Sequence, residues 1–169
     1  MRDIVLVVHD IRSTHNVGAL LRTCDGLGIS QVYLTGYTPF PKKGQDKRLP
    51  HIISKLDKQI NKTALGAEHS VSWQQSDNVD EVIVSLERKG YKIIGLEQTK
   101  DATKLQNFDP PEKVALVLGS EVEGISQELL KKCDIVLEIP MLGKKESFNV
   151  VEAASMALYH FRYSPFKKP

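Results

Sequence analysis

This 169-residue sequence has only two cysteines, no long apolar run and no marked excess of positive or negative charge. Its two cysteines, Cys24 and Cys133, are too few and too isolated for a disulfide framework or a zinc site. We therefore expect two reduced thiols and no bound metal. No apolar run approaches the ~18 residues of a membrane-spanning helix, and no signal-peptide pattern precedes Val5. These absences predict a cytoplasmic globular protein.

The rest of the composition is that of an ordinary globular domain. Hydrophobic residues make up 41% of the chain and charged residues 26%, with a formal net charge of +2. A chain of this length can bury roughly two thirds of its unfolded surface. We therefore expect one domain that spans residues 1–169.

Short β-branched runs alternate with amphipathic stretches along the chain. Strands are predicted at residues 4–8, 31–34, 71–73, 93–96, 113–118 and 135–139. Helices are predicted at residues 17–27, 51–62, 77–88 and 126–132, and from 149 onward. Asn16 and Asn149 are the expected N-caps of the first and last helices. The alternation predicts the α/β class, with a mainly parallel sheet and helices on both faces.

The stretch 139–159 organises the rest of the chain. Pro140 cannot donate to a strand ladder, so the preceding strand should stop there. Gly143 to Glu146 is polar and turn-like, and a helix follows Asn149. This loop therefore lies between the carboxyl end of a strand and the N-terminus of a helix, where open α/β proteins bind ligands.

Basic residues are concentrated in one part of the chain. They clearly outnumber Asp46 and Asp57 between positions 42 and 62, within and just after a long Pro- and Gly-containing loop at 35–50. The C-terminal residues add Arg162, Lys167 and Lys168. Such asymmetry is the electrostatic footprint expected for a phosphate backbone, although a solvated surface gives the same pattern.

Three stretches resemble the motifs of the SpoU/TrmH branch of the SPOUT RNA methyltransferases. They are residues 16–23 (NVGALLRT), 118–125 (LGSEVEGI) and 139–149 (IPMLGKKESFN), in family order and spacing. Phe148 departs mildly from the family, where leucine is commoner at this position. The resemblance covers nearly the whole chain and implies a SPOUT fold with a C-terminal trefoil knot and a homodimer.

The resemblance also implies an activity. It implies S-adenosylmethionine as cofactor and methylation of a ribose 2′-hydroxyl in RNA. Many relatives that modify rRNA carry an extra N-terminal RNA-binding domain, which we do not expect in this chain, so tRNA is favoured over rRNA. Two alternatives stay open: a catalytically inactive RNA-binding or regulatory protein of the same fold, and a methyltransferase that acts on a base. No Gly-x-Gly-x-x-Gly follows a predicted strand, which disfavours a dinucleotide site.

The family's catalytic residues map onto Arg22, Asn16, Glu121, Ser147 and Asn149. An unperturbed guanidinium cannot act as a base. Either RNA binding activates Arg22 as a base, or Arg22 orients a phosphate and stabilises the developing alkoxide, and we favour the second role. Glu121 would then pair with an arginine such as Arg22 of a second subunit.

Cofactor contacts follow from the same resemblance, whereas the expected RNA contacts come mainly from the basic loop at 35–50. The expected cofactor-binding residues are Leu96, Glu97, Leu118, Gly119, Gly124, Ile139, Met141, Leu142, Ser147 and Phe148. The expected RNA-binding residues are Arg12, Lys42, Lys43, Lys47 and Arg48. Glycines at 119 and 124 allow backbone to approach an adenosine closely.

Overall fold

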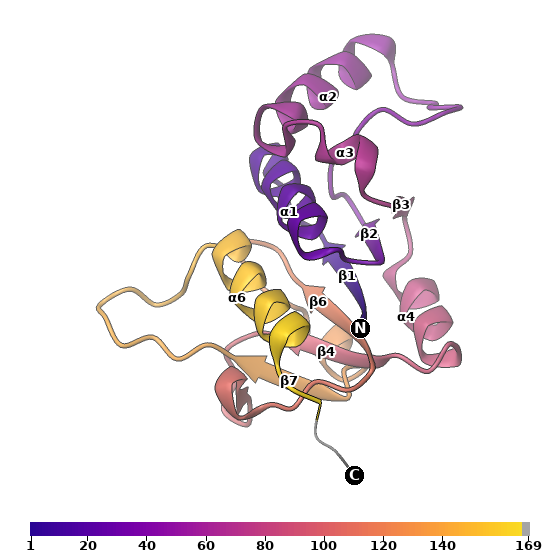
Figure 1. The fold of residues 1–169 in the computed structure, drawn as a ribbon. Coiled ribbons are helices and arrows are strands. Elements are labelled where there is room, and N and C mark those ends of the chain that lie inside the picture. The colour runs from indigo at the N-terminus through magenta and orange to yellow at the C-terminus, as the bar shows by residue number, and fades with distance from the viewer. Residues whose placement is uncertain (167–169) are drawn as a thin grey trace.

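The computed structural model describes residues 1–166, which form one seven-stranded sheet covered by helices (Figure 1). The strand order is β3-β2-β1-β6-β4-β7-β5, and every registered pair is parallel. The strands are β1 (Asp3–His9), β2 (Gln31–Thr35), β3 (Trp73–Ser76), β4 (Lys92–Leu96), β5 (Thr103–Lys104), β6 (Lys113–Leu118) and β7 (Ile135–Glu138). This arrangement confirms the predicted parallel α/β class; the trefoil knot stays a prediction.

Helices cover both faces of the sheet. They are α1 (Thr14–Leu27), α2 (Pro50–Ala64), α3 (Ala67–Ser70), α4 (Val79–Arg88), α5 (Gln127–Leu130) and α6 (Val150–Tyr163), with a 3₁₀ turn at Leu105–Asn107. One core joins the sheet to α1, α2, α3 and α6, and a second core joins the other face to α4 and α5. No helix in residues 1–166 is both long and apolar enough to cross a membrane.

The central strand β1 shows how the sequence builds two cores. Successive side chains of a strand point to opposite faces. Ile4, Leu6 and Val8 pack into the core with α1 and α6, whereas Val5 and Val7 pack into the core with α4. All five are at most 2% exposed. An apolar run without polar alternation therefore forms a strand buried on both sides.

Helix α1 packs against α2 through a glycine. A Cβ on Gly18 would lie 2.2 Å from Oγ1 of Thr63 and 2.3 Å from the carbonyl oxygen of Ile60. The Thr63 hydroxyl donates to the carbonyl oxygen of His15, again between the two helices. Only the absence of a side chain at position 18 allows this contact.

Two basic side chains join the chain ends. Arg2 is 4% exposed and donates to the carbonyl oxygens of Pro110, Phe161 and Ser164. Arg162 donates in return to the carbonyl oxygen of Arg2 and to those of Leu27 and Gly28. Strand β1 and the end of α6 are therefore fastened together.

Several predicted boundaries were wrong. Helix α1 begins at Thr14 with Ser13, not Asn16, as its N-cap, because the Ser13 hydroxyl accepts from the Asn16 N–H. The predicted strand at 71–73 overlaps β3 only at Trp73. The elements α3, β5 and the 3₁₀ turn were not predicted, because two to four residues are too few to show a period.

Candidate functional site

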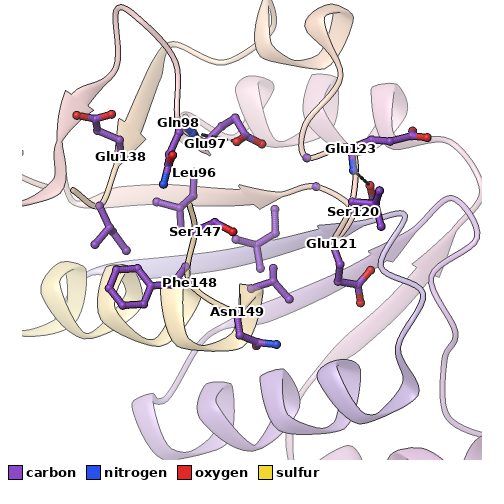
Figure 2. A pocket seen from close by; sticks show the side chains of 17 residues that line it. Leu96, Glu97, Gln98, Ser120, Glu121, Glu123, Glu138, Ser147, Phe148 and Asn149 are labelled. Atoms are coloured by element: carbon purple, nitrogen blue, oxygen red, sulfur yellow. Dashed lines mark hydrogen bonds between the residues drawn. The ribbon is translucent and has the colours of Figure 1, made fainter. Parts of the chain in front are cut away.

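A cavity of about 450 Å³ opens where β4, β6 and β7 end (Figure 2). These strands are neighbours in the sheet, so the loops that follow them meet at one edge. Its walls are formed by Leu96, Glu97, Gln98, Leu118, Gly119, Ser120, Glu121, Val122, Glu123, Gly124, Glu138, Ile139, Ser147, Phe148, Asn149, Val150 and Ala153.

The tight turn after β6 forms one wall of this cavity. Ser120 and Gly124 exchange two backbone hydrogen bonds, and a Cβ on Gly119 would lie 2.1 Å from the Gly124 carbonyl oxygen. Glu97, which follows β4, accepts a 2.9 Å hydrogen bond from the Ile125 N–H. Its carboxylate therefore fixes the far end of the turn against the neighbouring strand.

Glu121 connects this turn to the start of α1. Its carboxylate accepts hydrogen bonds from the backbone N–H groups of Arg12 and Ser13, at 3.0 and 3.1 Å, and from the Asn16 side-chain amide at 2.9 Å. Burial would raise the pKa of Glu121, but these hydrogen bonds outweigh it and the net pKa is lowered. Glu121 therefore holds the first turn of α1 within the described chain, without an arginine side chain as its partner.

The opposite wall comes from the loop before α6. Figure 2 shows Ser147, Phe148 and Asn149 across the cavity from the turn that carries Ser120 and Glu121. Asn149 is the N-cap of α6 as predicted, since its side chain accepts from the Val151 N–H at 2.8 Å. This cap determines where the loop ends and the helix begins.

The cavity is acidic. Four carboxylates lie in its walls, and no lysine, arginine or histidine is among the described wall residues. Two of the four are engaged, Glu97 with the turn and Glu121 with α1. Glu123 and Glu138 make no side-chain hydrogen bond within residues 1–166. An electrostatic field of this sign favours a cationic ligand.

The structure brings most of the predicted catalytic and cofactor-binding residues together and leaves four outside the cavity wall. Leu142 is 99% exposed, and Met141 is half-buried outside the cavity, because the loop between β7 and α6 extends away from the body (Figure 1). Arg22 lies on the exposed face of α1, and no hydrogen bond or ion pair joins it to residues 1–166. Asn16 reaches the cavity only through Glu121.

The sequence did not single out seven of the wall residues. They are Gln98, Ser120, Val122, Glu123, Glu138, Val150 and Ala153. Five of them lie in or beside a predicted strand end or turn. Their position next to the predicted site residues Glu97, Glu121 and Ile139 could therefore have identified them as wall residues. Val150 and Ala153 lie three residues apart in α6, which is the spacing of one helix face.

The predicted RNA-binding residues occupy different environments. Lys42, Lys47 and Arg12 are exposed, and Lys43 donates to the Gln75 side chain at 2.9 Å. Arg48 instead turns inward and donates to Asp46 at 2.9 Å. Lys167 and Lys168 lie outside the described residues. Within residues 1–166, no group of three or more His, Cys, Asp or Glu side chains is placed to hold a metal ion.

These features define a class of protein: a parallel α/β domain with a cavity at the strand ends, which two of the motif stretches border directly and the first reaches through Glu121. The family model described as the SpoU rRNA Methylase family matches residues 3–159. The chain belongs to this family, which confirms its resemblance to the SpoU/TrmH RNA methyltransferases.

Individual relatives agree with this assignment. A TrmH-family protein of Staphylococcus saprophyticus is 30% identical over 155 residues, which cover 92% of this chain and 56% of that protein. The tRNA (guanosine(18)-2′-O)-methyltransferase of Aquifex aeolicus is 27% identical over 158 residues, which cover 94% of this chain and 68% of that enzyme. The chain thus spans little more than half the length of the staphylococcal relative.

A solved structure shows the same fold. The AdoMet-bound rRNA methyltransferase from Sinorhizobium meliloti superposes with a TM-score of 0.77 at 18% sequence identity. The match covers 98% of this chain and 57% of that one. At this identity the similarity establishes the architecture.

Proposed function

We propose that this chain transfers a methyl group from S-adenosylmethionine to a ribose 2′-hydroxyl of tRNA. The observation that carries the proposal is the acidic cavity at the ends of β4, β6 and β7, which all three motif stretches border directly or through Glu121. The relationship to the ribose methyltransferase of Aquifex aeolicus supports tRNA as the substrate.

The cavity fits the cofactor in size and charge. Its volume of about 450 Å³ lies in the range of small-molecule sites. Bound there, S-adenosylmethionine supplies an electrophilic methyl group on a cationic sulfur, and the carboxylates of the wall favour that positive charge. The backbone of residues 96–98 and 119–124 and the side chains of Ser147 and Phe148 would hold it.

The chain's own residues orient the acceptor. Methyl transfer needs an oxygen that is aligned with the methyl group and loses its proton as it attacks. The Asn16 amide, fixed by Glu121, offers a hydrogen-bond donor at the mouth of the cavity. Arg22 would stabilise the developing alkoxide through the positive charge and N–H donors of its guanidinium.

Arg22 would do this in the site of a second copy. A homodimer through α1 and α6 is supported by three large side chains on one exposed face of α6, since Met156, Tyr159 and Tyr163 are 37%, 60% and 62% exposed. This face adjoins α1, where the Thr23 and Ser155 hydroxyls lie 3.2 Å apart. Exposed aromatic residues at helical spacing are typical of a surface that another chain covers.

The test is transfer of radiolabelled methyl from S-adenosylmethionine to unmodified tRNA and, separately, to rRNA. After digestion to nucleosides, we expect label in a 2′-O-methylnucleoside from tRNA and none with Arg22→Ala, which should still bind the cofactor in calorimetry. Label in a methylated base would instead establish the base methyltransferase. No label and no cofactor binding would establish the non-catalytic RNA-binding protein.

A further inference from the structure

A second cavity, of about 390 Å³, opens beyond the loop after β1, where β2 and β3 end. None of its wall residues borders the cavity at β4, β6 and β7. Its walls are formed by Arg12, Thr14, Gly36, Tyr37, Thr38, Pro39, Phe40, Arg48, Leu56, Gln75 and Asp77.

The corner that carries Tyr37 has an unusual backbone. Asp10 and Gly36 both adopt positive φ, at 57° and 63°, and a Cβ on Gly36 would lie 2.0 Å from Oδ1 of Asp10. The same oxygen accepts a 3.1 Å hydrogen bond from the Tyr37 N–H. Left-handed backbone at a residue other than glycine is found mostly at turns and functional sites. Here this backbone carries Tyr37, which is 56% exposed.

The ring of Phe40 forms a second aromatic wall of this cavity, and Arg48 packs against it. The Arg48 guanidinium lies 3.6 Å from the centroid of the Phe40 ring and donates to Asp46 and to the carbonyl oxygens of Phe40 and Pro41. Most N–H donors of the Arg48 guanidinium are therefore used by acceptors within its own loop. The Trp73 ring also lies near Phe40, with ring centroids 6.4 Å apart. Arg48 thus acts as a positioning residue that keeps this wall in place.

Arg12 connects the two cavities. Its backbone N–H donates to Glu121 in the wall of the first cavity, while its side chain lies in the wall of the second. The exposed guanidinium is 5.8 Å from the Tyr37 ring centroid. An RNA strand with its target nucleotide at the first cavity would therefore reach Arg12 and Tyr37 with a neighbouring nucleotide.

We propose that the second cavity binds a nucleotide that flanks the methylated one, with its base stacked on Tyr37 and its phosphate held by Arg12. The substrate being RNA rests on the proposed function. Because β2 lies between β1 and β3, a base on Tyr37 has Arg12 on one side and Asp77 on the other. Arginine binds phosphate and aromatic rings stack on bases, whereas a carboxylate accepts from exocyclic amino groups. The site should therefore prefer adenine or cytosine to uracil.

The test uses fluorescein-labelled hexamers of oligoadenylate and oligouridylate, without S-adenosylmethionine, and measures affinity by anisotropy. Trp73 is the single tryptophan of the chain, so its quenching locates the bound RNA beside Phe40. Tyr37→Ala and Arg12→Gln should each weaken oligoadenylate binding at least tenfold. Tyr37→Phe keeps the ring and should bind normally. Arg88→Gln removes an exposed guanidinium from the last turn of α4 and serves as the charge control.

The outcomes separate this inference from the proposed function. Unchanged affinity in Tyr37→Ala and Arg12→Gln, or binding without any change in Trp73 fluorescence, would overturn the inference. If no RNA accepts methyl but hexamer binding still depends on Tyr37, the flanking site stands and the enzymatic proposal fails. If methylation proceeds with the same KM for RNA in both variants, the enzymatic proposal stands and the flanking site fails.

Discussion

The side-chain amide of Asn16 donates a 2.9 Å hydrogen bond to the carboxylate of Glu121, across a sequence separation of 105 residues. The same carboxylate accepts from the N–H groups of Arg12 and Ser13 at the start of α1. The first N–H groups of a helix have no partner within it, so an acceptor placed there stabilises the helix. The turn after β6 and the start of α1, which belong to different motif stretches, are therefore joined into one structural unit by Glu121.

Glu121→Gln should weaken this unit. A glutamine retains one acceptor oxygen but turns an NH₂ group toward N–H donors. Because Glu121 is partly open to solvent, we expect the free energy of unfolding to fall by only about 1 kcal/mol, measured by urea denaturation. Glu123→Gln alters the same turn at a side chain without a hydrogen bond and should stay within about 0.5 kcal/mol of the parent.

Acid should remove the same stabilisation. Burial raises and hydrogen bonds lower the pKa of Glu121, and the net result lies below its ordinary value of 4.5. A carboxyl group with a lowered folded-state pKa stabilises the fold above its unfolded pKa, and this contribution is lost as the pH falls through the folded pKa. The stability difference between the parent and Glu121→Gln should therefore be largest near neutrality and shrink below pH 4.5. A difference that is constant down to acidic pH would contradict this.

Two glycines in α1 provide a matched pair. Gly18→Ala places a methyl group 2.2 Å from the Thr63 hydroxyl oxygen, so it should lower the free energy of unfolding by about 1–3 kcal/mol. Gly26→Ala meets no atom within 4 Å in the same helix and should be neutral or slightly stabilising. Urea denaturation of both variants checks this, and equal losses would show that the α1–α2 contact can shift.

Mixed dimers should reveal whether Arg22 acts across subunits. Arg22→Ala and Ser147→Ala should each lack methyl transfer. If each site combines Arg22 of one copy with Ser147 of the other, mixing the unfolded variants and refolding them should restore about a quarter of parental turnover, because half of the dimers mix and one of their two sites is intact. No recovery in dimers verified by ultracentrifugation would place both residues in one subunit.

The sequence was most informative where its patterns were long. Continuous apolar runs such as residues 113–118 predicted buried parallel strands, and the ordered motifs predicted which strand ends meet. Asn149 was identified as an N-cap because it directly precedes the apolar residues of that helix, with Glu152 three residues on.

Tertiary contacts explain what the sequence could not show. Asn16 was predicted as the N-cap, but Ser13 is the cap, and the position of Glu121 makes Asn16 an amide donor inside the helix. Arg48 was predicted to bind RNA together with lysines of the 35–50 loop, whereas in the structure its guanidinium donates to Asp46 and to the carbonyl oxygen of Phe40. Leu142 was expected in an apolar wall, but the path of its loop leaves it in solvent.

The fastening of Arg2 to the end of α6 bears on how the chain is made. Arg2 leaves the ribosome well before the residues whose carbonyl oxygens accept from it, Phe161 and Ser164. Until then the Arg2 guanidinium lacks acceptors that it uses in its buried position, and the core beside β1 lacks Phe161 and Leu158. A nascent chain stalled before α6 should thus stay incompletely packed, and this core should close only after α6 has been synthesised.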